Sequence, residues 1–218
     1  MGFNRILINI FKHMSRFNTP NLSSNTIPGF TDFTQKFTSV IESSTWINVQ
    51  EDFNFSARIL TVGNGGNLAV CDHGAIDIAR LTNKSASAPG SGILASSLIN
   101  DSSHDQWVKN WLTISLRGLS SELIKKTMLI GVSSSGYSKN ICLALDLAFE
   151  MGCKVCLISA KEPKLKGNYN KVILNVDEYH SSEVLTLSLF YQLIHGAGFC
   201  CPTISNSLKR QKIDDYTY

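Results

Sequence analysis

The chain has 218 residues, of which 43% are hydrophobic and 17% are charged, and its formal net charge is +3. This composition fits one globular domain with an extension, because it is too apolar for a disordered chain. The weak charge indicates no nucleic-acid partner, and no apolar run approaches the roughly 20 residues of a membrane span, so no membrane partner is expected.

Residues 1–29 are interpreted as an N-terminal arm and linker. The first 31 residues include Arg5, Lys12 and Arg16 but no acidic residue. An organelle transit peptide has this composition and is the alternative interpretation. Residues 17–29 are rich in Asn, Ser and Thr and hold two prolines, which is typical of a linker.

Beyond the linker, short apolar runs alternate with amphipathic segments. Apolar runs predict strands at residues 57–62, 93–98, 127–132, 154–158 and 172–176. Helical spacing predicts helices at 30–43, 66–80, 104–117, 140–151 and 181–195, with loops at 82–92 and 160–170. This alternation predicts an α/β domain over residues 30–200, a three-layer sandwich in which helices flank a five-stranded parallel sheet. Residues 201–218 are predicted to form a polar tail.

Two strand–loop–helix units repeat one pattern, at residues 58–67 and 128–138. Each loop holds glycine and hydroxyl or amide residues, and the second holds Ser133, Ser134, Ser135 and Ser138. Glycine lets the backbone approach a ligand closely, and the N-terminus of the following helix attracts an anion. Both loops follow the carboxyl ends of predicted parallel strands, so we expect them on one face. The pattern favours a phosphate site, and helix capping by serine is the alternative.

The six cysteines indicate a reducing compartment. Cys153 and Cys156 form a C-x-x-C motif, but they fall within a predicted strand, where alternation sends their side chains to opposite faces. We therefore interpret them as buried thiols. A zinc site and a redox pair are the alternatives.

At these loops the chain resembles the sugar isomerase (SIS) domain family, and most closely its phosphoheptose isomerase group. The resemblance spans residues 30–198 and depends on four segments: Gly63–Gly66 followed by His73 and Asp77, Asn100–Asp101, Val132–Ser138, and Glu150–Val155. It implies a sugar phosphate as ligand, a homotetramer or homodimer, and a cytoplasmic location. It also implies that the phosphate and sugar are bound by Asn64, Gly65, Gly66, Asn67, Asp101, Ser133, Ser134, Ser135 and Ser138.

For catalysis the resemblance implies His73, Asp77 and Glu183. Asp77 stands where the family has a glutamate, four residues after the histidine and therefore on the same helical face. The last family helix carries a second histidine, which falls on Phe190 if Glu183 is matched to the family glutamate, and on Ser188 in a register shifted by two. Neither register keeps that histidine. A zinc ion, as in some family members, would find His73 and Asp77 as ligands, fewer than the usual three or four.

These residues are compatible with three hypotheses for the function of the protein. The first hypothesis is an aldose–ketose isomerase of the phosphoheptose isomerase type, acting on sedoheptulose 7-phosphate or a similar sugar phosphate. The second is a non-catalytic phosphosugar-binding regulator or adaptor, because the second histidine is missing. A third keeps the fold but performs another sugar-phosphate step, in a nucleotide-sugar or glycan pathway.

Overall fold

The computed structural model describes residues 30–163 and 167–202, so the predicted arm and nearly all of the predicted tail lie outside the described residues. Five parallel strands form one sheet in the order β2-β1-β3-β4-β5. The strands are β1 (Arg58–Val62), β2 (Ser85–Ser87), β3 (Thr127–Val132), β4 (Lys154–Ser159) and β5 (Asn170–Ile173). The predicted five-stranded parallel sheet is confirmed.

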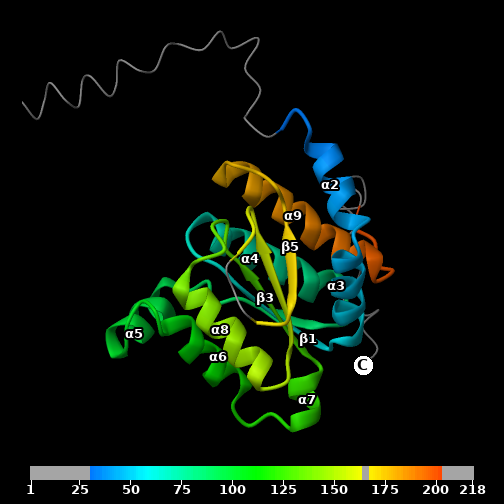
Figure 1. The fold of residues 1–218 in the computed structure, drawn as a ribbon. Helices are drawn as coiled ribbons and strands as arrows, with labels where there is room; N and C mark the ends of the chain where they lie inside the picture. The colour runs from blue at the N-terminus through cyan, green and yellow to red at the C-terminus, as the bar shows by residue number, and fades with distance from the viewer. Residues whose placement is uncertain (1–29, 164–166, 203–218) are drawn as a thin grey trace, which may run out of the picture.

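Helices cover both faces of this sheet (Figure 1). On one face lie α2 (Phe33–Ile41), α3 (Ser44–Phe55), α4 (Gly66–Leu81) and α9 (Tyr179–Gly196). On the other lie α6 (Trp107–Leu116) and α8 (Lys139–Glu150), together with the less buried α5 (Gly92–Asp101) and the short α7 (Ser121–Lys125). The molecule therefore has the predicted three layers. Among the described helices, none is long and apolar enough to cross a membrane.

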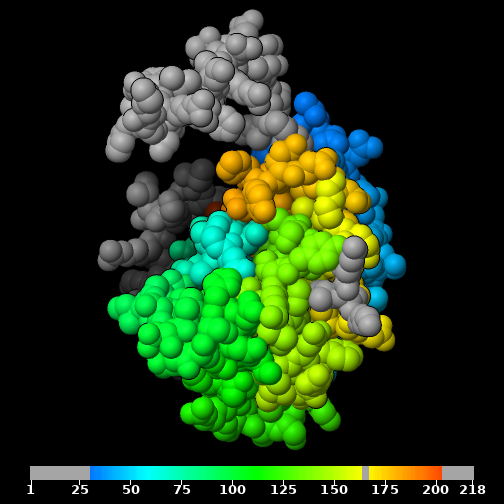
Figure 2. All heavy atoms as spheres, turned by 60° about the vertical axis from the view of Figure 1, so that its left-hand side comes forward, coloured from blue at the N-terminus to red at the C-terminus, as the bar shows by residue number. Residues whose placement is uncertain are grey.

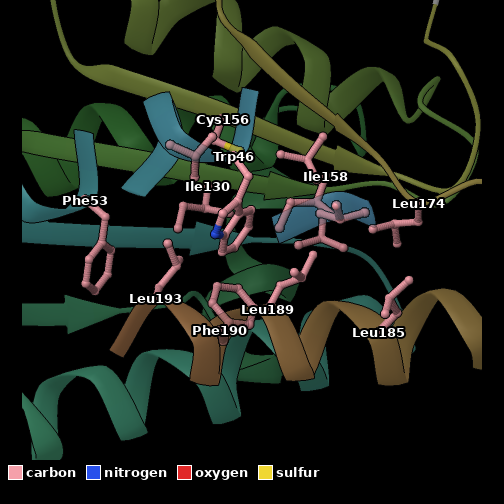
Figure 3. Packing of buried hydrophobic residues seen from close by; sticks show 14 of the residues in the cluster. Trp46, Phe53, Ile130, Cys156, Ile158, Leu174, Leu185, Leu189, Phe190 and Leu193 are labelled. Atoms are coloured by element: carbon pink, nitrogen blue, oxygen red, sulfur yellow. The ribbon is translucent and has the colours of Figure 1, made fainter. Parts of the chain in front are cut away.

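Alternate residues of the central strands fill two separate cores. Ile59 and Met128 point into the core beneath α3 and α9, whereas Leu60 and Leu129 point into the core beneath α6 and α8. Figure 3 shows the first core, where Phe190 and its neighbours on α9 pack beneath the strands. Because both faces of the strands are buried, their sequences are continuous apolar runs, which made them predictable.

The prediction of a second strand at residues 93–98 is wrong, because this segment belongs to helix α5. Leu94 and Leu98, four residues apart, are both half-buried against the core of α6, while Ile93 is 85% exposed. The actual second strand is β2, within the predicted loop at residues 82–92. It pairs with β1 at the edge of the sheet, and its Ser-Ala-Ser sequence carries no apolar signal.

The fifth strand lies two to three residues earlier than predicted, at Asn170–Ile173 instead of 172–176. Leu174 and Val176 are still buried, but Asn175 has a φ of 54°, in the left-handed region, which ends the extended conformation. Helices α3 and α7 were not predicted. Helix α3 begins at a serine cap, where Ser43 Oγ accepts the amide hydrogen of Trp46.

The C-x-x-C motif is split between the two cores, as alternation predicted. Cys156 lies in the core of α9 and Cys153 in the core of α8, so the pair does not face one ligand. Burial raises the pKa of Cys153 to about 11 and that of Cys156 well above its ordinary value. Both thiols therefore stay protonated and poorly nucleophilic in the folded protein.

We predict that iodoacetamide at mildly alkaline pH labels Cys200, which is exposed, and leaves Cys153 and Cys156 unmodified until the protein is unfolded. Peptide mass spectrometry before and after denaturation measures this. A Cys200→Ser, Cys201→Ser variant is the control and should lose the fast labelling. Fast labelling of Cys153 or Cys156 in the folded protein would support the redox alternative instead.

Candidate functional site

The glycine loop, residues 63–67, and the serine loop, residues 133–138, lie side by side at the carboxyl end of the sheet. The strands that precede them are paired, with Val62 opposite Gly131. Asn67 Nδ2 donates to Ser134 Oγ at 3.0 Å. The amides of Asn64 and Asn140 exchange hydrogen bonds of 3.0 and 2.8 Å. The prediction that the two loops meet on one face is therefore confirmed.

The serine loop is a tight turn that leaves the start of α8 uncapped. Gly136 has a φ of 71°, and its amide donates to the carbonyl of Ser133 at 2.8 Å. Ser133 Oγ donates to Ser138 Oγ at 2.9 Å and accepts the amide hydrogen of Ser138 at 3.3 Å. Ser138 precedes α8 but makes no side-chain capping bond. The first amides of α8 are thus free of a side-chain cap from Ser138, a geometry that suits an anion.

The other two serines of the loop point in opposite directions. Ser135 is exposed, and its hydroxyl accepts the amide hydrogen of Tyr137. Ser134 is buried and donates to Ser182 Oγ of α9 at 3.1 Å, so it links the serine loop to that helix. Asn67 completes this buried chain of side chains through its amide nitrogen, while its Oδ1 is buried without a hydrogen-bond partner.

Glu183 lies over the start of α4. A Cβ atom added to Gly66 would lie 2.1 Å from Glu183 Oε1, so the carboxylate lies directly against the backbone of Gly66. A negative charge at a helix N-terminus is stabilised by the helix dipole. A carboxylate therefore already lies at the start of α4, whereas Ser138 provides no side-chain cap at the start of α8. Figure 2 shows the cyan glycine loop between the yellow-green serine loop and the orange start of α9.

His73 and Asp77 lie further along α4, where they form one cluster with a residue of α9. His73 Nε2 lies 3.2 Å from Asp77 Oδ2 and 2.9 Å from the hydroxyl of Tyr191. The other carboxylate oxygen of Asp77 accepts from Arg80 at 3.2 Å. His73 is 56% exposed, whereas the Asp77 side chain is only 12% exposed. Asp77 is thus held between two donors, and His73 faces solvent.

Helices α4 and α9 run in the same direction, since Gly66 meets Glu183 near the start of each and Gly74 meets Phe190 further on. Gly66 and His73 are seven residues apart, which places them on one face and about 10 Å apart along the helix axis. The three residues predicted for catalysis are therefore divided: Glu183 lies beside the two loops, His73 lies about two turns further along α4, and Asp77 lies about three turns along it.

Phe190, one of the two positions matched to the second family histidine, is fully buried. A Cβ atom on Gly74 would lie 2.6 Å from its ring, so the two helices touch at this point. Ser188, the alternative position, donates to the carbonyl of Val184 within its own helix. The contact between Glu183 and Gly66 fits the register that assigns Phe190, because that register brings a carboxylate of α9 to the glycine loop.

Asp101 was predicted to contact the sugar because it was placed at the end of a strand. It is instead the last residue of helix α5, exposed, and its side chain accepts from neighbouring Asn100 at 3.4 Å. Helix α5 packs on α6 at the outer side of the fold (Figure 1). The structural reason for including Asp101 in the site is therefore lost.

Among the described residues, the side chains around His73 offer fewer ligands than the three or four that usually hold a zinc ion. Within residues 30–163 and 167–202, no group of three or more His, Cys, Asp or Glu side chains is placed to hold a metal ion. His73 and Asp77 supply two ligands, and Arg80 brings a positive charge to the carboxylate that would bind the ion. No step of the chemistry below is assigned to a metal.

Tyr191, Ser182 and Asn140 belong to the site but were not among the predicted residues. Tyr191 could have been found from Phe190, because the residue next to a buried helical position turns by about 100° toward a neighbouring surface. Ser182 and Asn140 are polar residues within or beside apolar helical stripes, and both are 1% exposed. A buried polar side chain requires a partner, and here those partners are the two loops.

The known proteins that resemble the chain in sequence or in fold include phosphoheptose isomerases. No family model matches the chain. A phosphoheptose isomerase of Syntrophotalea carbinolica is 27% identical over 146 residues, which are 64% of this chain and 67% of that protein. The phosphoheptose isomerase GmhA of Neisseria gonorrhoeae has a TM-score of 0.63 at 16% identity, over 88% of this chain and 98% of that one. The NanR protein of Vibrio vulnificus, complexed with ManNAc-6P, has a TM-score of 0.58 at 17% identity, over 78% of this chain and 59% of that one.

The five-stranded parallel sheet, with adjacent glycine and serine loops at its carboxyl end, has the fold of these solved phosphosugar isomerase structures. In sequence, the chain is similar to a phosphoheptose isomerase.

Proposed function

We propose that this protein is a phosphosugar isomerase that interconverts the ketose and aldose forms of sedoheptulose 7-phosphate or a similar sugar phosphate. The observation that carries the proposal is the contact between the two loops: the serine loop meets, through Asn67 and Ser134, the loop that opens the helix bearing His73 and Asp77. An anion site and an acid–base pair are thus joined by one rigid helix. The identity of the curated relative supports the same activity.

The phosphate is assigned to the serine loop, where Ser133, Ser135 and Ser138 offer hydroxyl groups and α8 offers its first amides. The sugar then extends along the groups of α4. The Glu183 carboxylate lies at the start of α4, close to the phosphate end, and is proposed to accept hydrogen bonds from sugar hydroxyls. Isomerisation moves a proton between adjacent carbons and needs a base for C–H and an acid for the carbonyl oxygen. Asp77, supported by His73, is the proposed base.

A second candidate function is a phosphosugar-binding regulator without catalysis. The buried Phe190 at the position matched to a family histidine favours it, because the group that a relative would use as an acid is absent there. The fold neighbour NanR, complexed with ManNAc-6P, shows that this fold also occurs in a protein that carries no isomerase name. Both candidates require the serine loop, and only the first requires His73 and Asp77.

The test follows isomerisation by NMR in D2O with phosphosugars of seven, six and five carbons, with and without zinc. The proposal predicts conversion of at least one sugar, with deuterium entering at the carbon next to the carbonyl. Thermal stabilisation by each sugar is measured in parallel. Stabilisation without conversion supports the regulator, and neither stabilisation nor conversion contradicts both candidates. Light scattering of the same sample tests the homotetramer or homodimer that the family resemblance implies.

A further inference from the structure

We infer that the hydroxyl of Tyr191 is the proton donor for the carbonyl oxygen of the substrate, in the role that Phe190 cannot fill. The inference deepens the proposed isomerase activity and depends on it. Its first support is contact: Tyr191 Oη lies 2.9 Å from His73 Nε2, and the two rings meet edge-on at 83°. Tyr191 is therefore directly beside the residues assigned to the base.

The second support is the way that α9 faces α4. Phe190 is turned into the core and packs against Gly74, so a polar group at this position would be buried among apolar side chains. Tyr191 follows it and is only half-buried, on the same side of the helix pair as His73. Among the described residues of α9, Tyr191 is the one that brings an ionisable group to His73 and Asp77.

The third support is the set of charges around the phenol. Burial raises the pKa of Tyr191 above its ordinary value, and the negative charge of Asp77 and the nearby Cys201 raise it further. The phenol therefore carries its proton at neutral pH. His73 Nε2 faces both Asp77 and Tyr191, and in the tautomer with its hydrogen on Nε2 this hydrogen is shared between the carboxylate and the phenol oxygen. The phenol hydrogen is then free to point at a substrate oxygen.

Asp77 takes a proton from C1 of the ketose, the C–H electron pair forms the C1–C2 double bond, and the carbonyl electron pair moves to O2. O2 takes the proton of Tyr191, which leaves an enediol and a phenolate that accepts a hydrogen bond from His73 Nε2–H. In the second half, the phenolate takes the proton of O1 while Asp77 returns its proton to C2. The product is the aldose, and both side chains regain their starting states.

The test compares Tyr191→Phe with Tyr179→Phe, a matched control on the same helix whose side chain is 67% exposed. We expect Tyr191→Phe to lower kcat by about 100-fold or more, the usual contribution of a general acid. KM and the thermal stabilisation by sugar phosphate should stay within about twofold to threefold of wild type, because the serine loop is unchanged. Tyr179→Phe should match wild type in all three quantities.

A second measurement separates acid catalysis from packing. Fluorotyrosine placed at position 191 keeps the ring but lowers the pKa of the phenol, so the alkaline limb of the pH–kcat profile should move to lower pH. Wild-type kcat in Tyr191→Phe, an effect confined to KM, or an unmoved alkaline limb each overturns the role of Tyr191 while the isomerase proposal stands. Absence of turnover in wild type overturns the isomerase proposal itself.

Discussion

Replacement of Ser133 by alanine is expected to weaken sugar-phosphate binding by about 10- to 100-fold, which corresponds to about 1.4–2.7 kcal/mol. Ser133 Oγ is both a proposed ligand contact and the partner of the hydroxyl and amide of Ser138. The alanine variant loses the hydroxyl that donates to Ser138 Oγ and accepts the amide hydrogen of Ser138, so the loop no longer holds the Ser138 hydroxyl in place as a donor to the phosphate. A hydrogen bond to a charged group contributes about 1.5–3 kcal/mol, which sets the size of the effect.

The measurement is the stabilisation of the folded protein by a sugar phosphate. At a ligand concentration of about 100 times Kd, wild type gains about 2.7 kcal/mol, whereas a variant with 100-fold weaker binding gains only about 0.4 kcal/mol at the same concentration. Ser97→Ala, an exposed serine on α5, is the control and should keep the full gain. Equal stabilisation of Ser133→Ala and wild type would mean that the phosphate does not bind at this loop.

Replacement of Phe190 by alanine is expected to lower the free energy of unfolding by about 3–5 kcal/mol. The side chain is fully buried between α9, the sheet and Gly74, and its neighbours cannot fill the space that it leaves. Denaturant unfolding followed by circular dichroism measures the change. Phe149→Ala, whose side chain is 45% exposed, should cost no more than about 1 kcal/mol. Similar losses in the two variants would contradict the packing of α4 against α9 through Phe190.

Most of the fold could be predicted because its central strands are buried on both faces. Strands β1, β3 and β4 are runs of apolar residues, and β1 and β3 lead into glycine or serine loops and helices. Strand β2 could not be predicted, because it is an edge strand of Ser-Ala-Ser held by pairing with β1. The segment at residues 93–98 was misassigned because a short apolar run fits a strand and a surface helix equally well, and only packing on α6 decides between them.

The site was predictable where one local segment forms it. The serine loop and the glycine loop are each contiguous in sequence, and parallel pairing brings them together. The contacts from α9 required the tertiary structure, because nothing in the sequence shows that Tyr191 faces His73 or that Glu183 lies on Gly66. The prediction for Asp101 was linked to a strand at residues 93–98, and this segment is helix α5. The contacts between α4 and α9 depend on packing between residues that are far apart in the sequence, such as Gly74 and Phe190.

The position of Glu183 on Gly66 has a consequence for the choice of substrate. The two loops look alike in sequence, but one of them already holds a carboxylate of the protein. A sugar that carries a second anionic group, such as a bisphosphate or a phosphorylated sugar acid, would bring a negative charge toward Glu183 and be repelled. A sugar with a single phosphate has only one favourable orientation, with the phosphate at α8 and its neutral hydroxyl groups toward α4. If the protein binds sugar phosphates as proposed, Glu183 is expected to favour monophosphates over ligands with a second anionic group, and to favour binding with the phosphate at α8.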